Sequence, residues 1–263
     1  MPKTAFILSS GRTGTKFLAE FLSANYPDIL ALHEPAPSYH LRMLSNARLA
    51  GSASRRLLIS ALRASRSGLA RRRAGRVYIE SNPFLFGFVE VFGEVFDDPL
   101  IFHIVRDPRE FTRSAINHGS ATGVKRLASS VVPYWFPNVS KLLKIDTPLT
   151  PVGVFAGQWR LVNEFLSGRG ESLAGYHRFT FEDVFGADHA GLRRMCETLE
   201  LPYPDAEARL SASEKVNAGK LSLMGQWPTW TAEQRQELDR VCGDLMRAYG
   251  YGDEPEWQIE TRL

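Results

Sequence analysis

Five short apolar runs alternate with longer stretches of helical hydrophobic pattern along this chain of 263 residues. The predicted strands cover residues 4–9, 28–32, 76–80, 99–105 and 176–181. The predicted helices cover 14–25, parts of 40–73, 84–95, 108–118, 154–167, 188–200 and 231–248. Strands that alternate with helices are typical of a mainly parallel sheet with helices on both faces. We therefore expect a three-layer α/β/α architecture.

The chain contains no linker rich in Pro, Gly or Ser, so we expect one domain over residues 1–263. Two segments have the character of insertions. The helical stretch 40–76 carries, from residue 42 on, ten arginines and no acidic residue. The stretch 119–151 is rich in Gly, Ser, Pro and aromatic residues and lacks a clear period. Long loops of this kind are often functional, so we expect this one at the acceptor site.

Composition narrows the classes of function and the compartment. With a formal net charge of only +3, the chain is not expected to bind nucleic acid. Cys196 and Cys242 form neither a disulfide framework nor a metal-ligand pattern. Without a signal-peptide pattern, or an apolar run near the roughly 18 residues of a membrane span, we expect a cytoplasmic protein. The arginines of 42–76 could contact the anionic inner surface of the membrane, or could form a solvated helix face.

The first predicted strand leads into a small polar turn that is followed at once by a helix. Glycines permit tight backbone angles and close approach of a ligand. The N–H groups and dipole at the start of a helix favour negative charge, and threonine hydroxyls, arginine and lysine add donors. The turn is therefore predicted to bind a phosphate or sulfonate. The candidate residues are Ser10, Gly11, Arg12, Thr13, Gly14, Thr15 and Lys16.

This turn departs from the ATP-binding P-loop, whose pattern is G-x-x-x-x-G-K-[ST]. With Lys16 as the lysine, the pattern requires Gly at position 15 and Ser or Thr at 17, where the chain has Thr15 and Phe17. The G-x-G-x-x-G pattern of dinucleotide-binding folds is also missing. The sequence shows no carboxylate pattern for Mg²⁺, so no metal is predicted.

A second anion site is predicted where the strand at 99–105 ends in Arg106-Asp107-Pro108. Proline is favoured in the first turn of a helix, so the helix begins here and Arg106 lies at the carboxyl end of a strand. Open α/β sheets bind ligands at this edge. Ser114, a little over two helical turns later, can face the same side. An arginine fork and a serine hydroxyl suit a phosphate monoester.

A candidate general base lies at the end of the second predicted strand, Leu32-His33-Glu34-Pro35. If this strand neighbours the first, both titratable side chains lie beside the anion-binding turn. An acceptor hydroxyl has to lose its proton to such a base. The ordinary pKa of histidine suits proton abstraction near neutrality. The residues themselves leave open whether Glu34 or His33 is the base.

Together these motifs resemble those of sulfotransferases that use 3′-phosphoadenosine-5′-phosphosulfate (PAPS), most closely the carbohydrate branch. The family's 5′-phosphosulfate loop typically reads S-S-x-R-S-G-S-S-F-L, and this chain has SSGRTGTKFL, with Lys16 in place of a small hydroxyl residue. Its 3′-phosphate segment reads R-D-P-R followed by a serine, as here. The resemblance implies a P-loop-like sulfotransferase fold. It also implies that Arg12 contacts the sulfonate, that Arg106 and Ser114 bind the 3′-phosphate, and that Glu34 is the base.

The resemblance is looser over KVNAGKLSLMGQWPTW, at residues 215–230. Members of the family often have a basic loop here that closes over the nucleotide, which makes Lys215, Asn217 and Lys220 candidates for cofactor binding. The implied reaction moves sulfonate from PAPS to an acceptor hydroxyl on a carbohydrate or glycolipid and leaves adenosine 3′,5′-bisphosphate. Two alternatives stay open: a nucleotide-dependent small-molecule or sugar kinase, and a non-catalytic nucleotide-binding protein of the same fold.

Overall fold

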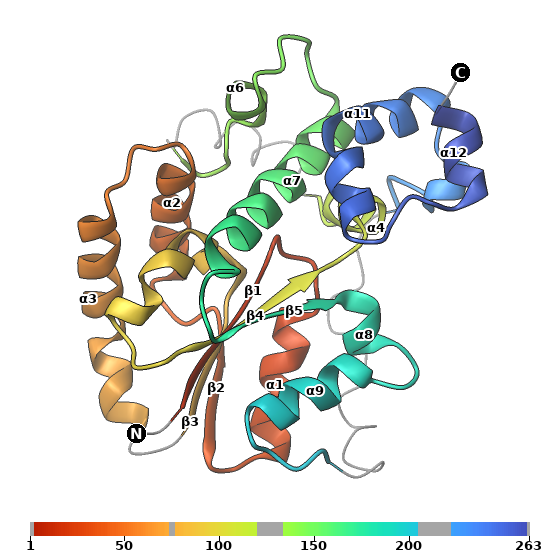
Figure 1. Cartoon of the computed structure of the whole chain (residues 1–263). Helices are drawn as coiled ribbons and strands as arrows, with labels where there is room; N and C mark the ends of the chain where they lie inside the picture. Colours follow the sequence, from red (N-terminus) through yellow and green to blue (C-terminus); the bar gives the residue numbers. More distant parts are fainter. Residues whose placement is uncertain (1–2, 74–76, 120–133, 205–221, 262–263) are drawn as a thin grey trace. The chain divides into compact units, whose positions relative to one another are not determined.

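The structure, a computed structural model, describes residues 3–73, 77–119, 134–204 and 222–261 (Figure 1). The chain divides into two compact units, each made from two stretches of sequence. The first unit comprises Met1–Val105 and Phe165–Asn217, and the second comprises Arg106–Glu164 and Ala218–Leu263. That residues 1–263 act as one domain stays a prediction.

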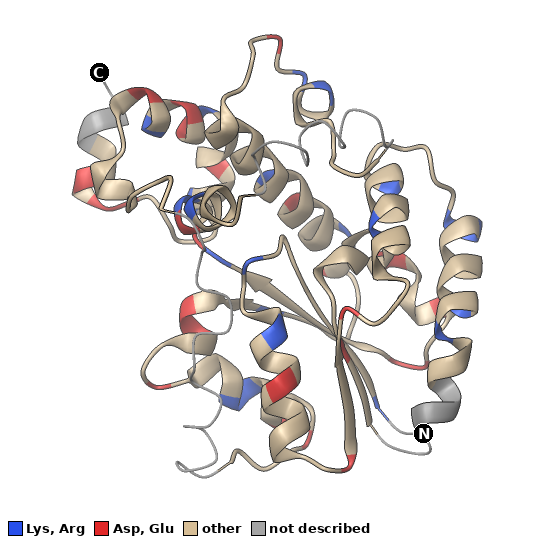
Figure 2. Ribbon diagram, turned by 180° about the vertical axis from the view of Figure 1, so that it is seen from behind, with Lys and Arg blue, Asp and Glu red and all other residues tan. Residues whose placement is uncertain are grey.

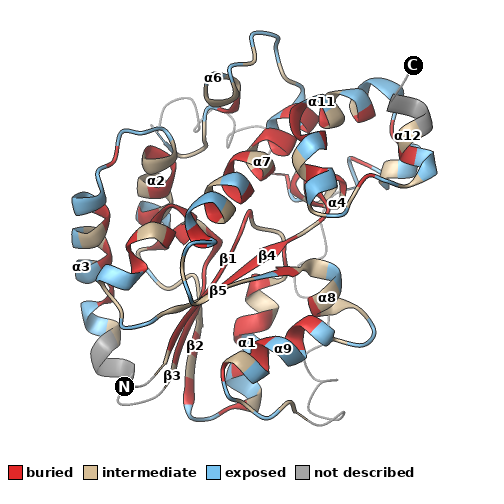
Figure 3. Ribbon diagram, in the orientation of Figure 1, coloured by how far each residue is buried: buried red, intermediate tan, exposed pale blue. Residues whose placement is uncertain are grey.

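The first unit is built on a five-stranded, all-parallel sheet in the order β2-β3-β1-β4-β5. The strands are β1 (Thr4–Ser9), β2 (Ile29–His33), β3 (Val77–Ser81), β4 (Leu100–Val105) and β5 (Tyr176–Thr180). The three inner strands are buried along nearly their whole length, whereas the two edge strands are partly exposed (Figure 3). The apolar runs therefore located every strand of the sheet, and the predicted α/β fold class is confirmed.

Helices cover both faces of this sheet, as Figure 1 shows. The helices of the first unit are α1 (Thr15–Asn25), α2 (Ser38–Leu49), α3 (Arg55–Arg73), the 3₁₀ helix η1 (Pro83–Glu94), α8 (Phe181–Phe185) and α9 (Ala190–Thr198). Since successive strand residues face opposite sides, Ala5 and Ile7 pack in the core formed with α1, α8 and α9. Phe6 faces the other way and stacks on Phe92 of η1, with 3.9 Å between ring centroids.

The arginine-rich stretch forms α2 and α3, and blue marks the positions of its described basic residues along these helices (Figure 2). Several of its arginines pair with acidic residues of the same unit. Arg48 and Arg55 both form ion pairs with Glu90 of η1, and Arg55 also pairs with Glu94. Arg63 donates to the backbone carbonyl of Glu94 at 2.9 Å. Part of the positive charge that the sequence concentrates here is therefore paired within the unit.

The second unit is helical in its described part. Its elements are α4 (Pro108–Asn117), α6 (Val139–Leu143), α7 (Pro151–Gly170, which ends in the first unit), the 3₁₀ helix η2 (Trp227–Thr229), α11 (Ala232–Ala248) and α12 (Pro255–Thr261). The short helix α6, whose N-cap Asn138 accepts a hydrogen bond from the N–H of Lys141, lies inside the stretch predicted as a loop. Trp159 and Trp257 are fully buried and anchor the core of this unit.

Candidate active site

The loop between β1 and α1 is shaped from within by Ser9, the last residue of β1. Ser9 Oγ accepts hydrogen bonds from the backbone N–H of Gly11 at 3.0 Å and from the hydroxyl of Thr13 at 2.7 Å. Both Ser9 and Thr13 are fully buried. Thr13 was predicted to offer its hydroxyl to an anion, but its hydroxyl hydrogen is directed to Ser9. Its backbone N–H is the donor that it can contribute to a ligand.

The loop backbone has an unusual conformation around Arg12. Gly11, Arg12 and Gly14 have positive φ angles of 93°, 57° and 71°. Such angles cost free energy at a residue with a side chain, so an arginine held this way is a sign of a functional turn. Turns that alternate handedness direct successive N–H groups into a concavity that suits anions. Gly14 is also the N-cap of α1 and has no side chain to occupy the helix start.

Ser10 and Lys16 differ in exposure and in their partners. Ser10 Oγ is buried and has no hydrogen-bond partner among the residues that the structure describes. A buried hydroxyl left in this way is destabilising unless a ligand or water meets it. Ser10 therefore fits an oxygen of a bound phosphate or sulfonate. The Lys16 side chain is 44% exposed, and its ammonium lies 3.5 Å from Glu20 one turn later in α1.

Gly14 is the loop position that tolerates a side chain least. A Cβ there would lie 2.4 Å from the ring of Phe185, and its φ is +71°. We expect Gly14→Ala to lower the free energy of unfolding by about 2–4 kcal/mol, as overpacking adds to backbone strain. Gly11→Ala is the matched control because its φ is +93° but nothing lies within 4 Å of its Cβ. It should lose about 1–2 kcal/mol in the same urea titration, from backbone strain alone. Equal losses would contradict the role of Phe185.

The strand carrying the candidate bases is not a neighbour of β1, because β3 lies between β2 and β1. Ser81, the last residue of β3, links the two sides. Its backbone carbonyl accepts from the N–H of Glu34 at 3.2 Å and lies 3.1 Å from His33 Nδ1. Its hydroxyl donates to the carbonyl of Thr15, in the first turn of α1, at 2.7 Å. Ser81 is fully buried, and sequence reasoning missed it.

His33 and Glu34 lie together at the end of β2. His33 Nε2 is 3.6 Å from Glu34 Oε1. Burial raises the pKa of Glu34, while the positive charges of His33 and Arg42 oppose the rise. Burial also lowers the pKa of Arg42 to about 10, against the attraction of Glu34. Since a carbonyl can only accept, His33 Nδ1 carries a hydrogen toward Ser81. With its hydrogen on Nδ1, a neutral ring presents only a lone pair at Nε2 to the carboxylate. The contact between Nε2 and Glu34 is therefore favourable only when a further proton is bound by Nε2 or by the carboxylate.

In the second unit, Arg106 follows the end of β4 directly and lies at the start of α4. Its carbonyl accepts from Trp159 Nε1 at 2.8 Å, and its Nη2 lies 3.8 Å from Glu110 Oε2. Asp107 is the N-cap of α4, and its carboxylate pairs with Arg109. Ser114 is half-buried, two turns along the same helix.

Among the described residues of the second unit, Arg109 is the most enclosed charged group, with 1% of its surface exposed. Its guanidinium pairs with Asp107 and, at 2.6 Å, with Glu254 near the C-terminus. It also lies over the rings of Trp227 and Trp257, 4.3 Å and 5.1 Å from their centroids. Burial alone would lower the pKa of Arg109, but the hydrogen bonds to the two carboxylates raise it overall. The fourth residue of the R-D-P-R segment thus ties α4 to residues 227–257.

The predicted C-terminal cofactor residues Lys215, Asn217 and Lys220 lie outside the described part of the chain. The chain just after them is held by Asn117 at the end of α4. Asn117 Oδ1 accepts from the N–H groups of Leu223 and Met224, and Nδ2 donates to the Met224 carbonyl.

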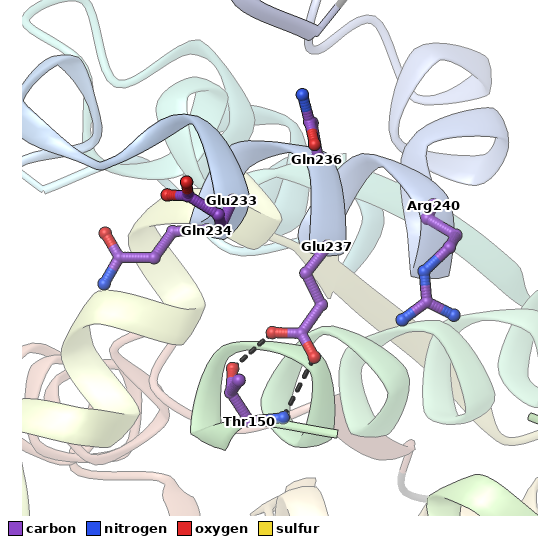
Figure 4. Close-up of a pocket in the computed structure, with 6 residues that line it drawn as sticks. All are labelled: Thr150, Glu233, Gln234, Gln236, Glu237 and Arg240. Atoms are coloured by element: carbon purple, nitrogen blue, oxygen red, sulfur yellow. Dashed lines mark hydrogen bonds between the residues drawn. The ribbon is translucent and has the colours of Figure 1, made fainter. Parts of the chain in front are cut away.

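A groove of about 390 Å³ in the second unit carries no predicted site residue. It is lined by Thr150, Glu233, Gln234, Gln236, Glu237 and Arg240 (Figure 4). Glu237 accepts hydrogen bonds from the N–H groups of Thr150 at 2.9 Å and Gly153 at 3.2 Å, and so caps the start of α7. This carboxylate has a structural role. Within the described ranges, no group of three His, Cys, Asp or Glu side chains could hold a metal ion, and no helix is long and apolar enough to cross a membrane.

Comparison with solved structures decides the fold. A sulfotransferase from Alicyclobacillus acidocaldarius matches with a TM-score of 0.55 at 16% identity, covering 98% of this chain and 99% of the other. The sulfotransferase domain from the curacin biosynthetic pathway matches with a TM-score of 0.54 at 15% identity, covering 93% and 98%. The chain has a sulfotransferase fold. A sulfotransferase domain from the Synechococcus PCC 7002 olefin synthase is 19% identical over 99% of this chain and 94% of its own, with a TM-score of 0.48.

The predicted P-loop-like sulfotransferase fold is therefore confirmed. Identities this low show the fold and leave the reaction, the acceptor and the carbohydrate branch as predictions. No protein-family model and no curated protein matches the chain.

Proposed function

We propose that this protein transfers a sulfonate group from PAPS to a hydroxyl group of an acceptor. The observation that carries the proposal is the β1–α1 loop of a chain with a sulfotransferase fold. In that loop a buried Ser10 hydroxyl without a partner among the described residues and a left-handed Arg12 meet the uncapped start of α1. An arginine, a hydroxyl and convergent N–H groups suit the sulfonate end of such a donor.

Each part of the donor has a predicted partner. Residues 10–16 bind the 5′-phosphosulfate, while Arg106 and Ser114 bind the 3′-phosphate, with Lys215, Asn217 and Lys220 as further candidates. PAPS, when bound, supplies the activated sulfonate. Arg12 stabilises the negative charge that develops on the leaving nucleotide, which is an electrostatic role that can dominate the rate of such transfers. No step in this scheme requires a metal.

Glu34 and His33 together provide the base. The acceptor oxygen forms a bond to sulfur as the bond between sulfur and the leaving phosphate oxygen breaks, and the acceptor proton moves to this pair. Glu34, with its pKa raised by burial, is a stronger base than an ordinary glutamate. His33 is oriented by Ser81 through Nδ1, so its Nε2 can share the incoming proton with the carboxylate.

A carbohydrate or glycolipid is the proposed acceptor class, supported by the loop sequence and by the Glu34-Pro35 strand end. Tyr39, five residues after Glu34, is 58% exposed and packs beside Phe84, 5.6 Å between ring centroids. Such a ring offers a flat apolar face to a sugar ring. Contact of residues 42–76 with an anionic membrane surface also stays a prediction, and the ion pairs of Arg48 and Arg55 reduce the charge available for it.

The donor class is tested by thermal unfolding with adenosine 3′,5′-bisphosphate, compared with ATP–Mg²⁺ and with ADP–Mg²⁺. A ligand at 100 times its Kd should stabilise the native protein by about 2.7 kcal/mol. Arg106→Ala should lose this stabilisation. The matched control is Arg113→Ala in α4, the helix that follows Arg106. Arg113 pairs with Glu110, and its loss should leave the stabilisation unchanged. Labelled PAPS with a panel of sugars and glycolipids then tests the acceptor class.

Other outcomes favour the alternatives. Stabilisation by ATP–Mg²⁺ in place of the bisphosphate would favour a kinase, although Thr15 and Phe17 depart from its P-loop. Binding of the bisphosphate without sulfonate transfer to any acceptor of the panel would favour a non-catalytic nucleotide-binding protein. Binding of neither nucleotide would contradict the proposal.

A further inference from the structure

A buried ion pair lies beneath the segment that carries Glu34. Glu80 of β3 is 0% exposed and Arg66 of α3 is 4% exposed. Arg66 Nε donates to Glu80 Oε2 at 2.8 Å, and Nη2 donates to Oε1. Glu80 stands beside Phe6 of β1 in the sheet register. Removing two charges from water costs several kcal/mol per ion, and an apolar pair of similar volume is often at least as stable. Stability alone therefore does not explain this pair.

The hydrogen bonds of Glu80 are complete. Besides Arg66, its carboxylate accepts from the Tyr78 hydroxyl at 2.6 Å and from Asn82 Nδ2 at 2.8 Å. Four donors thus occupy the four favourable positions around the two oxygens. A fully satisfied buried network of this kind is rigid and specifies one arrangement of the groups that it joins.

One branch of the network leads to the turn after Glu34. Asn82 Nδ2 also donates to Ser38 Oγ at 2.9 Å, and Ser38 Oγ in turn donates to the carbonyl of Pro35 at 2.6 Å. Ser38 is the first residue of α2 and is 3% exposed. The carbonyl that it holds belongs to the residue directly after Glu34.

A second branch comes from the arginine itself. Arg66 Nη1 lies 3.5 Å from the carbonyl of Ala36 and donates to it. On the other side of the turn, the N–H of Glu34 is bound by the carbonyl of Ser81, the residue next to Glu80. Glu34 itself has a positive φ of 43°. Its backbone is thus fixed both before and after the residue, in a conformation that a non-glycine residue adopts at a cost.

We propose that the Arg66–Glu80 pair positions Glu34, because it fixes the turn that follows this residue. The proposal rests on the function proposed above, in which Glu34 accepts the acceptor proton. Arg66 and Glu80 touch no reacting atom in this scheme. They act through Asn82, Ser38 and two backbone carbonyls, which keep the Glu34 carboxylate at its half-buried place beside His33.

The test compares two serines of α2 that are both buried. Ser38→Ala removes the link to the Pro35 carbonyl and leaves the ion pair intact. Ser45→Ala is the matched control because its hydroxyl donates to the Phe84 carbonyl and accepts from the Gly87 N–H, away from the turn. A third protein, Arg66→Met with Glu80→Met, removes both charges together, so that no buried charge is left unpaired.

Two readouts separate positioning from stability. The pKa of Glu34 is followed by carboxyl carbon NMR, with the signal assigned by its loss in Glu34→Gln. We expect this pKa to fall toward the ordinary glutamate value in Ser38→Ala and in the double variant, as the carboxylate reaches water, and to stay unchanged in Ser45→Ala. His33 and Arg42, the charged groups facing Glu34, are intact in all three proteins. The kcat for sulfonate transfer should fall roughly 10- to 100-fold in the first two proteins, while the stabilisation by adenosine 3′,5′-bisphosphate persists.

The outcomes are distinguishable. An unchanged Glu34 pKa in Ser38→Ala, or the same change in Ser45→Ala, would overturn the positioning role. If the double variant does not unfold cooperatively, the serine pair decides by itself. If the wild-type protein transfers no sulfonate, the proposed function fails, while the NMR titration still decides whether the network holds Glu34.

Discussion

Glu34→Gln should reduce the rate of sulfonate transfer by about 10²- to 10⁴-fold, the contribution of a positioned general base. Glutamine has nearly the shape of glutamate and keeps the backbone hydrogen bond to Ser81, but it cannot accept the acceptor proton. Binding of adenosine 3′,5′-bisphosphate should be unchanged, because the variant leaves the β1–α1 loop and Arg106 intact. Single-turnover rates with labelled PAPS, beside thermal unfolding with the bisphosphate, measure the two effects separately.

The pH profile identifies which member of the pair limits the rate. The base works deprotonated, so the wild-type rate should fall as the pH is lowered through the raised pKa of Glu34. This acidic limb should disappear in Glu34→Gln. His33→Gln is the companion variant, and it should keep an acidic limb that moves to higher pH, because the positive charge of His33, which lowers the pKa of Glu34, is gone. An acidic limb that persists in Glu34→Gln and vanishes in His33→Gln would make His33 the base.

The same raised pKa makes stability depend on pH in a defined direction. Between the ordinary and the raised pKa, the folded protein binds more protons at Glu34 than the unfolded chain does. Stability contributed by protonated Glu34 is therefore present at lower pH and is lost as the pH rises through this window. Glu34→Gln should remove this part of the dependence, which urea titrations across the window would detect.

Local signals in the sequence located the strands, the turn between β1 and α1 and the residues at the strand ends. Apolar runs mark buried strands because the backbone there must be covered on both faces. Local signals do not predict the order of the strands in the sheet. β2 follows β1 in the chain, but β3 lies between them in the sheet. The long connection from β2 to β3 through α2 and α3 carries no local sequence signal of this placement. This is why Ser81, which links Thr15 to Glu34, was not found.

The ion-pair partners of charged residues could not be predicted from the sequence either. The sequence of 42–76 predicted arginines that face a membrane or water, since no acidic residue lies within the stretch. The acidic partners of Arg48, Arg55 and Arg66 come from β3 and η1, later in the chain, and one pair, Arg66 with Glu80, is buried. An arginine's charge does not reveal whether it faces water or a carboxylate. A visible hint was Glu80 itself, a carboxylate inside an apolar run.

Arg109→Met should lower the free energy of unfolding by about 3–5 kcal/mol, the usual effect of breaking a buried pair by removing one partner. The change leaves the Asp107 carboxylate, 7% exposed, without its guanidinium and beside a second acid, Glu254. It also removes the cation from the faces of Trp227 and Trp257. Urea unfolding followed by far-UV circular dichroism measures the loss.

Arg113→Met is the matched control, one turn further along α4. Arg113 pairs with Glu110 at 2.7 Å, but the two side chains are 30% and 26% exposed, so water screens the pair. Its loss should cost about 0–1 kcal/mol.

The Arg109 cluster also makes stability depend on pH. The hydrogen bond from Arg109 lowers the pKa of Glu254. The stability that ionised Glu254 contributes is therefore present above the ordinary carboxyl pKa and is lost as the pH falls through the lowered value. Arg109→Met should lose this acidic dependence and Arg113→Met should keep it. Equal stability losses, or an unchanged pH dependence in Arg109→Met, would mean that the cluster does not hold α4 to the C-terminal helices.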